Sequence, residues 1–324
     1  MRPISASAGA KLAGLTVLAA HLAIVPMTML TKVSIDLASF AQVYLFFLLF
    51  AAAACYMHWR AMHLFKHALL ASLFGLMLAI PVLVSTYAAI SLDMPLADQR
   101  LIAMDNAIGF DWLRFIEYVD RQAWLARILQ HSYESFALQL LVLPALLVVI
   151  GKSERGYGLV VAYAVLCFLS SFISVWFPAL GAYPTFQLSA AAMQNIDAHF
   201  GYFFVDQFNA VRDHGAFTIS LGSAAGIITF PSVHAGVALV CSWAAWGSIW
   251  LRLPFLLLNI FMALSAISHG SHYLVDIVAG VAVAILAIAI TSLVIFRRGT
   301  ANQSAVGTYV NSQPRPSSPA AASD

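Results

Sequence analysis

The sequence predicts an all-α integral membrane protein, a polytopic bundle of about eight transmembrane helices with an additional amphipathic helix at the membrane surface. Apolar residues make up 62% of the 324 residues, charged residues make up only 9%, and the mean hydropathy is +0.87. The apolar residues also form stretches of about 20 residues, the length that a helix needs to cross a bilayer. These observations together exclude an ordinary water-soluble domain.

Eight apolar stretches follow one another along the chain, and the fourth of them is the shortest. They lie at 12–30, 38–57, 68–90, 135–150, 157–178, 231–250, 253–270 and 273–296. The first resembles a secretory signal because Arg2 and Lys11 precede it. It is nevertheless about 20 residues long, contains His21 and Pro26, and lacks a clear cleavage site, so we expect a retained helix.

Three polar segments complete the chain. Residues 98–131 place charges among Leu, Ile, Phe and Trp at helical spacing, which predicts an amphipathic helix that packs over the bundle. Residues 179–229 form a long segment rich in Gly, Phe, Asp and His, and segments of this length are usually lids or binding elements. Residues 299–324 are rich in Ser, Ala and Pro, and we expect a disordered cytoplasmic tail.

The distribution of basic residues predicts the orientation of the bundle. If the N-terminus is cytoplasmic and eight helices alternate, 10 of the 16 basic residues lie inside. These are Arg2, Lys11, Arg60, Lys66, Lys152, Arg155, Arg252, Arg297, Arg298 and Arg315. The other six lie on or near the outer side, five of them in the two long segments, where the positive-inside rule is weak: Lys32, Arg100, Arg114, Arg121, Arg127 and Arg212.

Several classes of site are not supported by the sequence. Cys55, Cys167 and Cys241 are isolated within apolar stretches, so neither a disulfide framework nor a zinc site is implied. There is no glycine-rich phosphate loop, no dinucleotide fingerprint and no HExxH pair. The net charge of +2 gives no reason to expect a nucleic-acid partner. We therefore expect no metal and no cofactor, and the oligomeric state stays open.

Two histidine motifs carry the most specific chemical information. His272 and Asp276 lie four residues apart in Gly270-Ser271-His272-Tyr273-Leu274-Val275-Asp276, at the start of the last apolar stretch. On a helix this spacing puts the carboxylate beside the imidazole, where it can orient the ring and stabilise its charged form. His234, in Phe230-Pro231-Ser232-Val233-His234, begins an earlier stretch. Either histidine alone would more often be a structural residue.

The two motifs in this order resemble the second and third motifs of the type 2 phosphatidic acid phosphatase superfamily. Within it, the chain is most similar to the inositolphosphotransferase-like branch, which contains the aureobasidin-resistance-type inositol phosphorylceramide synthases. Leu101–Trp112 and Ser132-Tyr133-Glu134-Ser135 are similar to that branch too. The resemblance implies a catalytic membrane domain over residues 98–298, preceded by N-terminal transmembrane helices over 1–97 and followed by the tail 299–324.

The resemblance also implies a mechanism. His272 would attack phosphorus to form a phosphohistidine, Asp276 would orient it, and His234 would protonate the departing oxygen. The first N–H groups of the helices that begin near Pro231 and His272 are possible phosphate donors. Ser232 is either a further donor or a helix N-cap.

The chain departs from the superfamily pattern in its arginines. The third motif usually begins Ser-Arg, but Ser265-Ala266 stands at that place, and the first motif is absent. Arg212 is the candidate for the missing phosphate clamp, because guanidinium can grip phosphate with two hydrogen bonds. The alternative is a solvated Arg that pairs with Asp206 or Asp213. His214, His269 and backbone amides are further candidates for phosphate binding.

The leading functional hypothesis is an integral-membrane lipid phosphoesterase or phosphotransferase that acts without metal on a phospholipid or lipid phosphate. The charge distribution puts its histidines at the outer face, the periplasmic side of a bacterial inner membrane. Hydrolysis and head-group transfer stay open, because both share the phosphohistidine. The alternatives are a histidine-dependent transporter, a haem-binding membrane protein, or a pseudoenzyme that has lost turnover together with its arginines.

Overall fold

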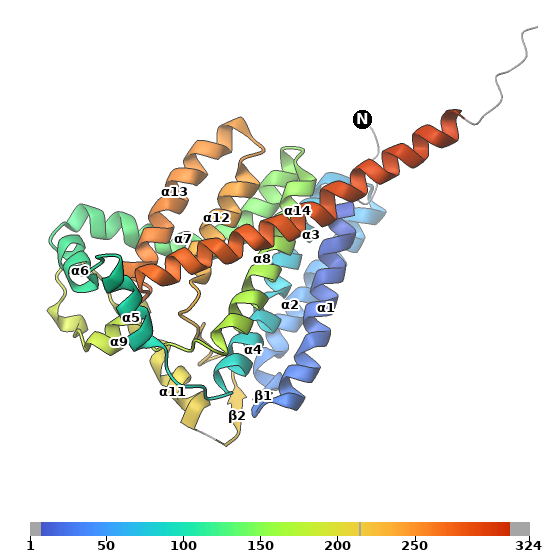
Figure 1. Ribbon diagram of the computed structural model, residues 1–324. Coiled ribbons are helices and arrows are strands. Elements are labelled where there is room, and N and C mark those ends of the chain that lie inside the picture. The colour runs from blue at the N-terminus through green and yellow to red at the C-terminus, as the bar shows by residue number, and fades with distance from the viewer. Residues whose placement is uncertain (1–7, 214, 312–324) are drawn as a thin grey trace, which may run out of the picture.

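The computed structural model describes residues 8–213 and 215–311 and is a helical membrane protein (Figure 1). Seven helical segments are long and apolar enough to cross a membrane, which confirms the polytopic helical fold class. They are α1 (Ala8–Leu30), α2 (Leu37–Trp59), α3 (His63–Met77) together with α4 (Ala79–Ile90), α7 (Ala123–Val149), α8 (Ser153–Ser174), α13 (Ile249–Ser268) and the first part of α14 (Leu274–Asn311).

The sixth predicted stretch, 231–250, contains only the short helix α12 (Val233–Ala245). A helix of 13 residues is about 20 Å long, shorter than the apolar thickness of a bilayer. It packs against α7, α8, α13 and α14. α12 begins at Val233, directly after the buried Ser232, and His234 in its first turn is partly exposed.

The predicted bounds of the fourth stretch and of the amphipathic segment were wrong. α7 begins at Ala123, so the membrane helix predicted at 135–150 includes the end of the expected surface helix. The rest of that segment forms two helices, α5 (Asp98–Ala107) and α6 (Trp112–Asp120). The segment divides because the Asp111 side chain accepts a hydrogen bond from the Arg114 N–H and caps the start of α6.

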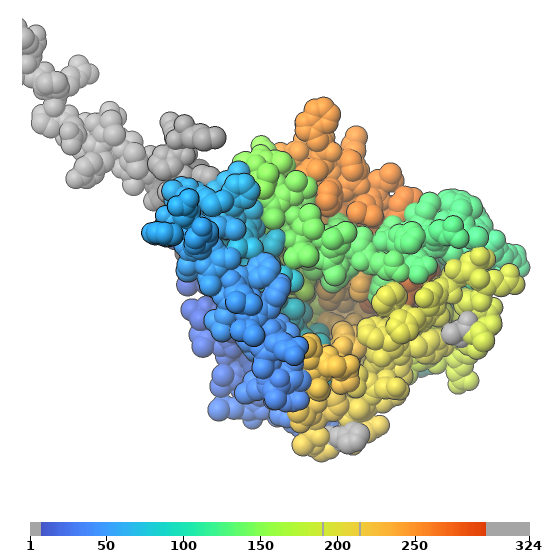
Figure 2. Space-filling model, turned by 180° about the vertical axis from the view of Figure 1, so that it is seen from behind, coloured from blue at the N-terminus to red at the C-terminus, as the bar shows by residue number. Residues whose placement is uncertain are grey.

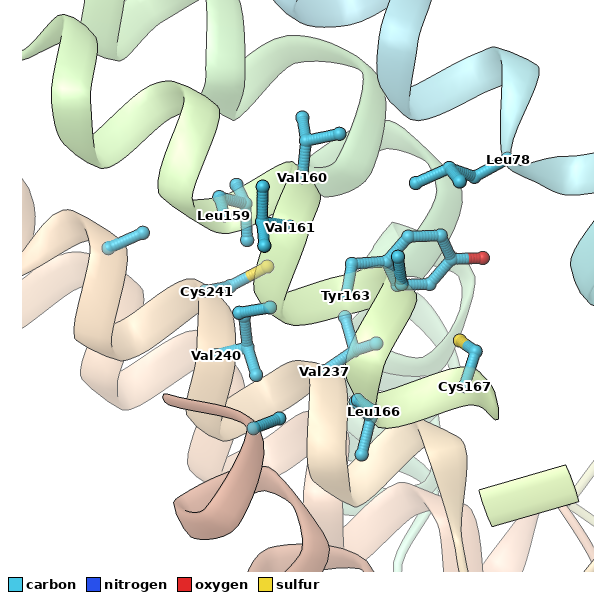
Figure 3. Packing of buried hydrophobic residues seen from close by; sticks show 14 of the residues in the cluster. Leu78, Leu159, Val160, Val161, Tyr163, Leu166, Cys167, Val237, Val240 and Cys241 are labelled. Carbon is cyan, nitrogen blue, oxygen red and sulfur yellow. The ribbon is translucent and has the colours of Figure 1, made fainter. Parts of the chain in front are cut away.

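The core of the bundle lies around α8. Figure 3 shows Leu159, Val160, Val161, Tyr163, Leu166 and Cys167 of α8 packed with Val237, Val240 and Cys241 of α12 and with Leu78 between α3 and α4. α14 approaches α12 closely at Gly280, where a Cβ atom would lie only 2.1 Å from the Ser232 carbonyl oxygen. Glycine at this position therefore lets the start of α12 lie directly against α14.

The segment 179–229 is built of short elements rather than one loop. They are α9 (Ala182–Phe186), a 3₁₀ turn (Ala190–Ala192), α10 (His199–Tyr202), α11 (Val205–Asp213) and β2 (Phe217–Ile219). β2 pairs in parallel with β1 (Val33–Ile35), which the sequence did not predict. Figure 1 shows α5, α6 and α9 near the start of α14, away from the N-terminus.

The C-terminal tail differs in part from expectation. α14 continues as a helix to Asn311, beyond residue 298 where the disordered tail was expected to begin. The remainder of that tail, 312–324, lies outside the described residues.

Candidate active site

His272 lies in the turn that precedes α14, and Asp276 lies in the first turn of that helix. The Nδ1 atom of His272 is 3.2 Å from Oδ2 of Asp276, and both residues are buried. The same carboxylate oxygen accepts the Tyr273 N–H at 3.0 Å, so Asp276 caps the helix and positions the imidazole. The predicted pairing is confirmed, although His272 precedes the helix instead of belonging to it. Its Nε2 atom has no hydrogen-bond partner among the described residues.

The turn that carries His272 is held by the chain segment that follows α8. Ala182 N–H donates to the Ser271 carbonyl at 2.8 Å, and Tyr183 N–H donates to Ser271 Oγ at 2.9 Å. Gly181 has a φ of 95°, and a Cβ atom there would lie 2.7 Å from Ser271 Oγ. This segment begins the region 179–229, for which the sequence predicts a lid or a binding element. In the fold it buttresses the proposed nucleophile.

Two buried carboxylates on α5 position the same turn. Asp98 accepts the N–H groups of Leu180 and Gly181 and the Tyr273 hydroxyl, each at 2.9 Å. Asp105, two helical turns later on the same face, accepts the N–H groups of Leu274 and Val275 at 2.9 Å. The sequence analysis gave neither residue a role. The available signal was that both recur at helical spacing in a segment resembling the superfamily.

A further contact comes from α6. The indole Nε1 of Trp112 donates to the His272 carbonyl at 3.1 Å, and its ring stacks on Phe186 of α9. The surface segment thus holds the His272 turn through three side chains, Asp98, Asp105 and Trp112. The segment packs over the bundle, as expected, and it also fixes the position of the His272 turn.

The two helix starts differ in the N–H groups they leave free. At α14, the N–H groups of Tyr273, Leu274 and Val275 are taken by Asp276 and Asp105, so the expectation of phosphate donors there is wrong. At α12, Ser232 is the N-cap, and its Oγ accepts the Ala235 N–H at 3.3 Å. Among the described residues, nothing accepts from the N–H groups of Val233 and His234. The start of α12 can therefore donate to an anion.

His234 and His272 face one cavity of about 480 Å³. Their ring centroids are 6.3 Å apart, close enough for one phosphoryl group to contact both. The His234 ring stacks on Tyr133 of α7 at 4.2 Å and contacts Phe136 at 4.5 Å. The other walls come mainly from α4, α10 and residues 226–229. Figure 2 shows the hollow on this face between α7 in green and the segment 200–229 in yellow.

The cavity contains little charge. Its wall includes no Lys or Arg of the described chain, and Glu134 is its one carboxylate. Arg212, on α11, is absent from the wall; it pairs with Asp93 Oδ1 at 2.8 Å and donates to the Met94 carbonyl at 3.0 Å. The structure therefore does not bring Arg212 to the histidines, and its partner is neither Asp206 nor Asp213. The reason is that α11 packs against α4, where Asp93 and the Met94 carbonyl hold the guanidinium.

The other expected phosphate binders are distributed differently. His214 lies outside the described residues. His269 is fully buried beside the cavity wall, with Nδ1 3.0 Å from Ser268 Oγ. Burial lowers the pKa of His269 to about 4, while the negative charges of Asp197 and Glu134 act in the opposite direction. His269 is therefore neutral at pH 7. The fold brings together His272, Asp276, His234 and the capping Ser232.

Comparison with known proteins identifies one family. The domain described as PAP2 superfamily matches residues 99–290, from α5 to α14. No curated protein and no solved structure matches the chain. The matched region contains both histidine motifs and Asp105, one of the two α5 carboxylates that hold the His272 turn. Since it also covers more than half of the sequence, the chain belongs to the PAP2 superfamily.

Proposed function

We propose that this protein is a lipid phosphoesterase or phosphotransferase that acts through a phosphohistidine at His272. One observation carries the proposal: His272 and His234 line the same apolar cavity, and Asp276 lies 3.2 Å from Nδ1 of His272. A carboxylate that fixes the tautomer of an imidazole makes its other nitrogen the nucleophile. Membership of the superfamily supports this chemistry.

In the first step, Nε2 of His272 attacks phosphorus and forms a P–N bond as the P–O bond to the leaving group breaks. His234 donates a proton to the departing oxygen. Neither ring nitrogen of His234 has a hydrogen-bond partner within the described chain, so both are open to substrate. The charge that develops on His272 is balanced by Asp276.

In the second step, the hydroxyl of an acceptor attacks phosphorus, the P–N bond breaks, and His234 takes the acceptor proton. If the acceptor is water the result is hydrolysis, and if it is a lipid alcohol the result is head-group transfer. The resemblance of residues 101–112 and 132–135 to the inositolphosphotransferase-like branch slightly favours transfer, whereas the general chemistry of the superfamily favours hydrolysis. The N–H groups of Val233 and His234 are the donors we propose for the phosphate oxygens.

The charge distribution supports an active site at the outer face of the membrane. Lys152 and Arg155 lie at the end of the bundle where α7 and α8 meet, opposite the end where α14 begins. The positive-inside rule then makes the histidine end extracytoplasmic, which in a bacterial inner membrane is the periplasmic side.

Purified protein tested against a panel of lipid phosphates and phosphodiesters, with and without an alcohol acceptor, examines this function directly. We expect turnover with at least one lipid and an acid-labile phosphoprotein intermediate. The His272→Ala protein is the control, with its fold checked by thermal unfolding. Undiminished turnover in folded His272→Ala protein would rule out the mechanism.

A further inference from the structure

The cavity beside the two histidines has an unexpected charge for a phosphate site. Glu134 of α7 is its one carboxylate, and its side chain is 41% exposed. It accepts from Gln130 Nε2 at 3.1 Å and lies 3.3 Å from Nδ1 of His131, but no Lys or Arg of the described chain forms an ion pair with it. A carboxylate near a phosphate repels it unless a cation lies between them.

Aromatic rings line the same cavity as this carboxylate. Tyr133, which precedes Glu134, stacks on His234 and lies 5.3 Å from the Phe200 ring of α10. The rings of Phe200 and Phe203 are 6.0 Å apart and nearly perpendicular, and both line the cavity. Aromatic faces next to a carboxylate form the environment that attracts an organic ammonium ion, because the ring quadrupole and the negative charge act together.

The rest of the cavity matches the other parts of a phospholipid. The side chains of Ala79, Val82 and Leu83 on α4 provide an apolar wall for an acyl chain. The two histidines mark the place of the phosphorus atom. Glu134 is connected to them through its neighbour on α7, Tyr133, whose ring stacks on His234. Ethanolamine and choline head groups carry a positive nitrogen two carbon atoms from a phosphate oxygen, so a single lipid supplies a group for each of these three regions of one cavity.

We propose that the substrate is a zwitterionic phospholipid whose ammonium head group is held by Glu134 and the rings of Tyr133, Phe200 and Phe203. The inference rests on the proposed function for the reaction, but the binding site stands on its own geometry. It also accounts for the missing arginines. A phosphodiester carries one negative charge, less than a phosphomonoester, and needs less positive charge around it.

The test compares kcat/KM for micellar phosphatidylethanolamine, phosphatidylcholine, phosphatidylglycerol and phosphatidic acid. We expect kcat/KM for one or both ammonium lipids to be about tenfold higher. That ratio corresponds to the free energy of a partly exposed ion pair combined with a cation–π contact. Glu134→Gln should remove that preference, and Phe200→Leu should reduce it while keeping the apolar volume. Glu117→Gln, an exposed α6 carboxylate paired with Arg121, is the matched control and should retain the preference.

A binding measurement separates this inference from the proposed function. Native mass spectrometry of the His272→Ala protein should show the same lipid preference without turnover, and Glu134→Gln in that background should abolish it. Selective binding by the wild-type protein without turnover of any lipid in the panel would contradict the proposed function and leave the binding site standing. Turnover that prefers phosphatidylglycerol or phosphatidic acid, or a preference for ammonium lipids unchanged by Glu134→Gln, would overturn the site.

Discussion

At the scale of single residues, the site depends on how each polar side chain is partnered. Asp276 is fully buried and serves both the imidazole of His272 and the N–H of Tyr273. Arg212, in contrast, is occupied by Asp93 and the Met94 carbonyl. Both residues were candidates for the same site. Their partners indicate that Asp276 positions the imidazole, whereas Arg212 forms an ion pair away from the histidines.

The first prediction concerns the order of effects at the His–Asp pair. His272→Ala should reduce turnover nearly to background because it removes the nucleophile, and Asp276→Ala should be about a hundredfold less severe because orientation contributes less. Single-turnover kinetics of folded proteins would measure both. Equal loss in the two variants would mean that Asp276 acts as more than a positioning residue.

The second prediction concerns Arg212. A phosphate clamp would lose about 2 to 4 kcal/mol of transition-state stabilisation on Arg212→Ala. Because the guanidinium pairs with Asp93, we expect kcat/KM close to that of the matched variant Arg114→Ala, and a loss in unfolding free energy of at most about 1 kcal/mol. A hundredfold lower kcat/KM with an unchanged melting temperature would return Arg212 to the site.

At the scale of elements, α5 and α6 act as a brace for the start of α14 and for the segment 179–229. Asp105 holds the first N–H groups of α14, and Asp120 holds three N–H groups of residues 194–196. Each carboxylate replaces hydrogen bonds that the receiving segment cannot make for itself. The positions of His272 and of the cavity wall therefore depend on helices that bear no catalytic group.

Asp105→Ala should lower the unfolding free energy by about 1 to 2 kcal/mol, because two N–H groups at the helix start lose their acceptor. Turnover should fall with it as His272 loses its position. Asp105→Asn, which keeps one carbonyl oxygen, should restore part of both, and exposed Asn106→Ala is the control. Thermal unfolding in detergent measures the stability of each variant, and kcat measures its turnover. If Asp105→Asn recovers stability but no activity, Asp105 has a role beyond positioning.

The hydrogen bonds of Asp120 predict that the stability of the folded protein depends on pH. Burial raises its pKa, but the N–H groups of Gln194, Asn195 and Ile196 outweigh burial, and the pKa is lowered. Its folded pKa thus lies below the unfolded value of about 3.9, so its contribution is fully present above that pH and is lost as pH falls through the folded pKa. The melting temperature of wild type should exceed that of Asp120→Asn at pH 5 to 7. The difference should shrink below pH 4, and a difference that grows on acidification would contradict this assignment.

At the scale of the whole molecule, α5, α9 and the start of α14 lie close together (Figure 1), and His272 directly precedes α14. Lys152 lies in the connection between α7 and α8, at the opposite end of the bundle. Ser223 is exposed at the first end and Lys152 at the second. Ser271 is buried and unsuitable as a reporter of this end.

In a Cys55→Ala background, which removes the exposed native thiol, Ser223→Cys should react with an impermeant thiol reagent in intact cells. Lys152→Cys should react only after the membrane is opened, because the positive-inside rule puts it in the cytoplasm. Labelling of Lys152→Cys alone in intact cells would invert the proposed orientation.

The sequence by itself determined the membrane class and the pairing of His272 with Asp276. Both are local properties: composition decides whether a segment prefers lipid, and four residues of spacing bring two side chains together at a helix start. The same local reasoning misjudged the bounds of α7, the division of residues 98–131 and the shortness of α12. In each case a cap or a packing contact decides where the helix begins or ends.

Only the tertiary structure decided which distant residues share the site. Asp105 meets Leu274 across 169 residues of chain, Gly181 meets Asp98 across 83, and Arg212 meets Met94 across 118. None of these contacts leaves a periodic pattern in the sequence, because each depends on how helices pack and on which N–H groups remain without a partner after packing. A buried carboxylate is stable only where the fold supplies hydrogen-bond donors to it, and the fold supplies donors to Asp98 and Asp105 beside His272. The acceptors for Arg212, in contrast, lie away from the histidines.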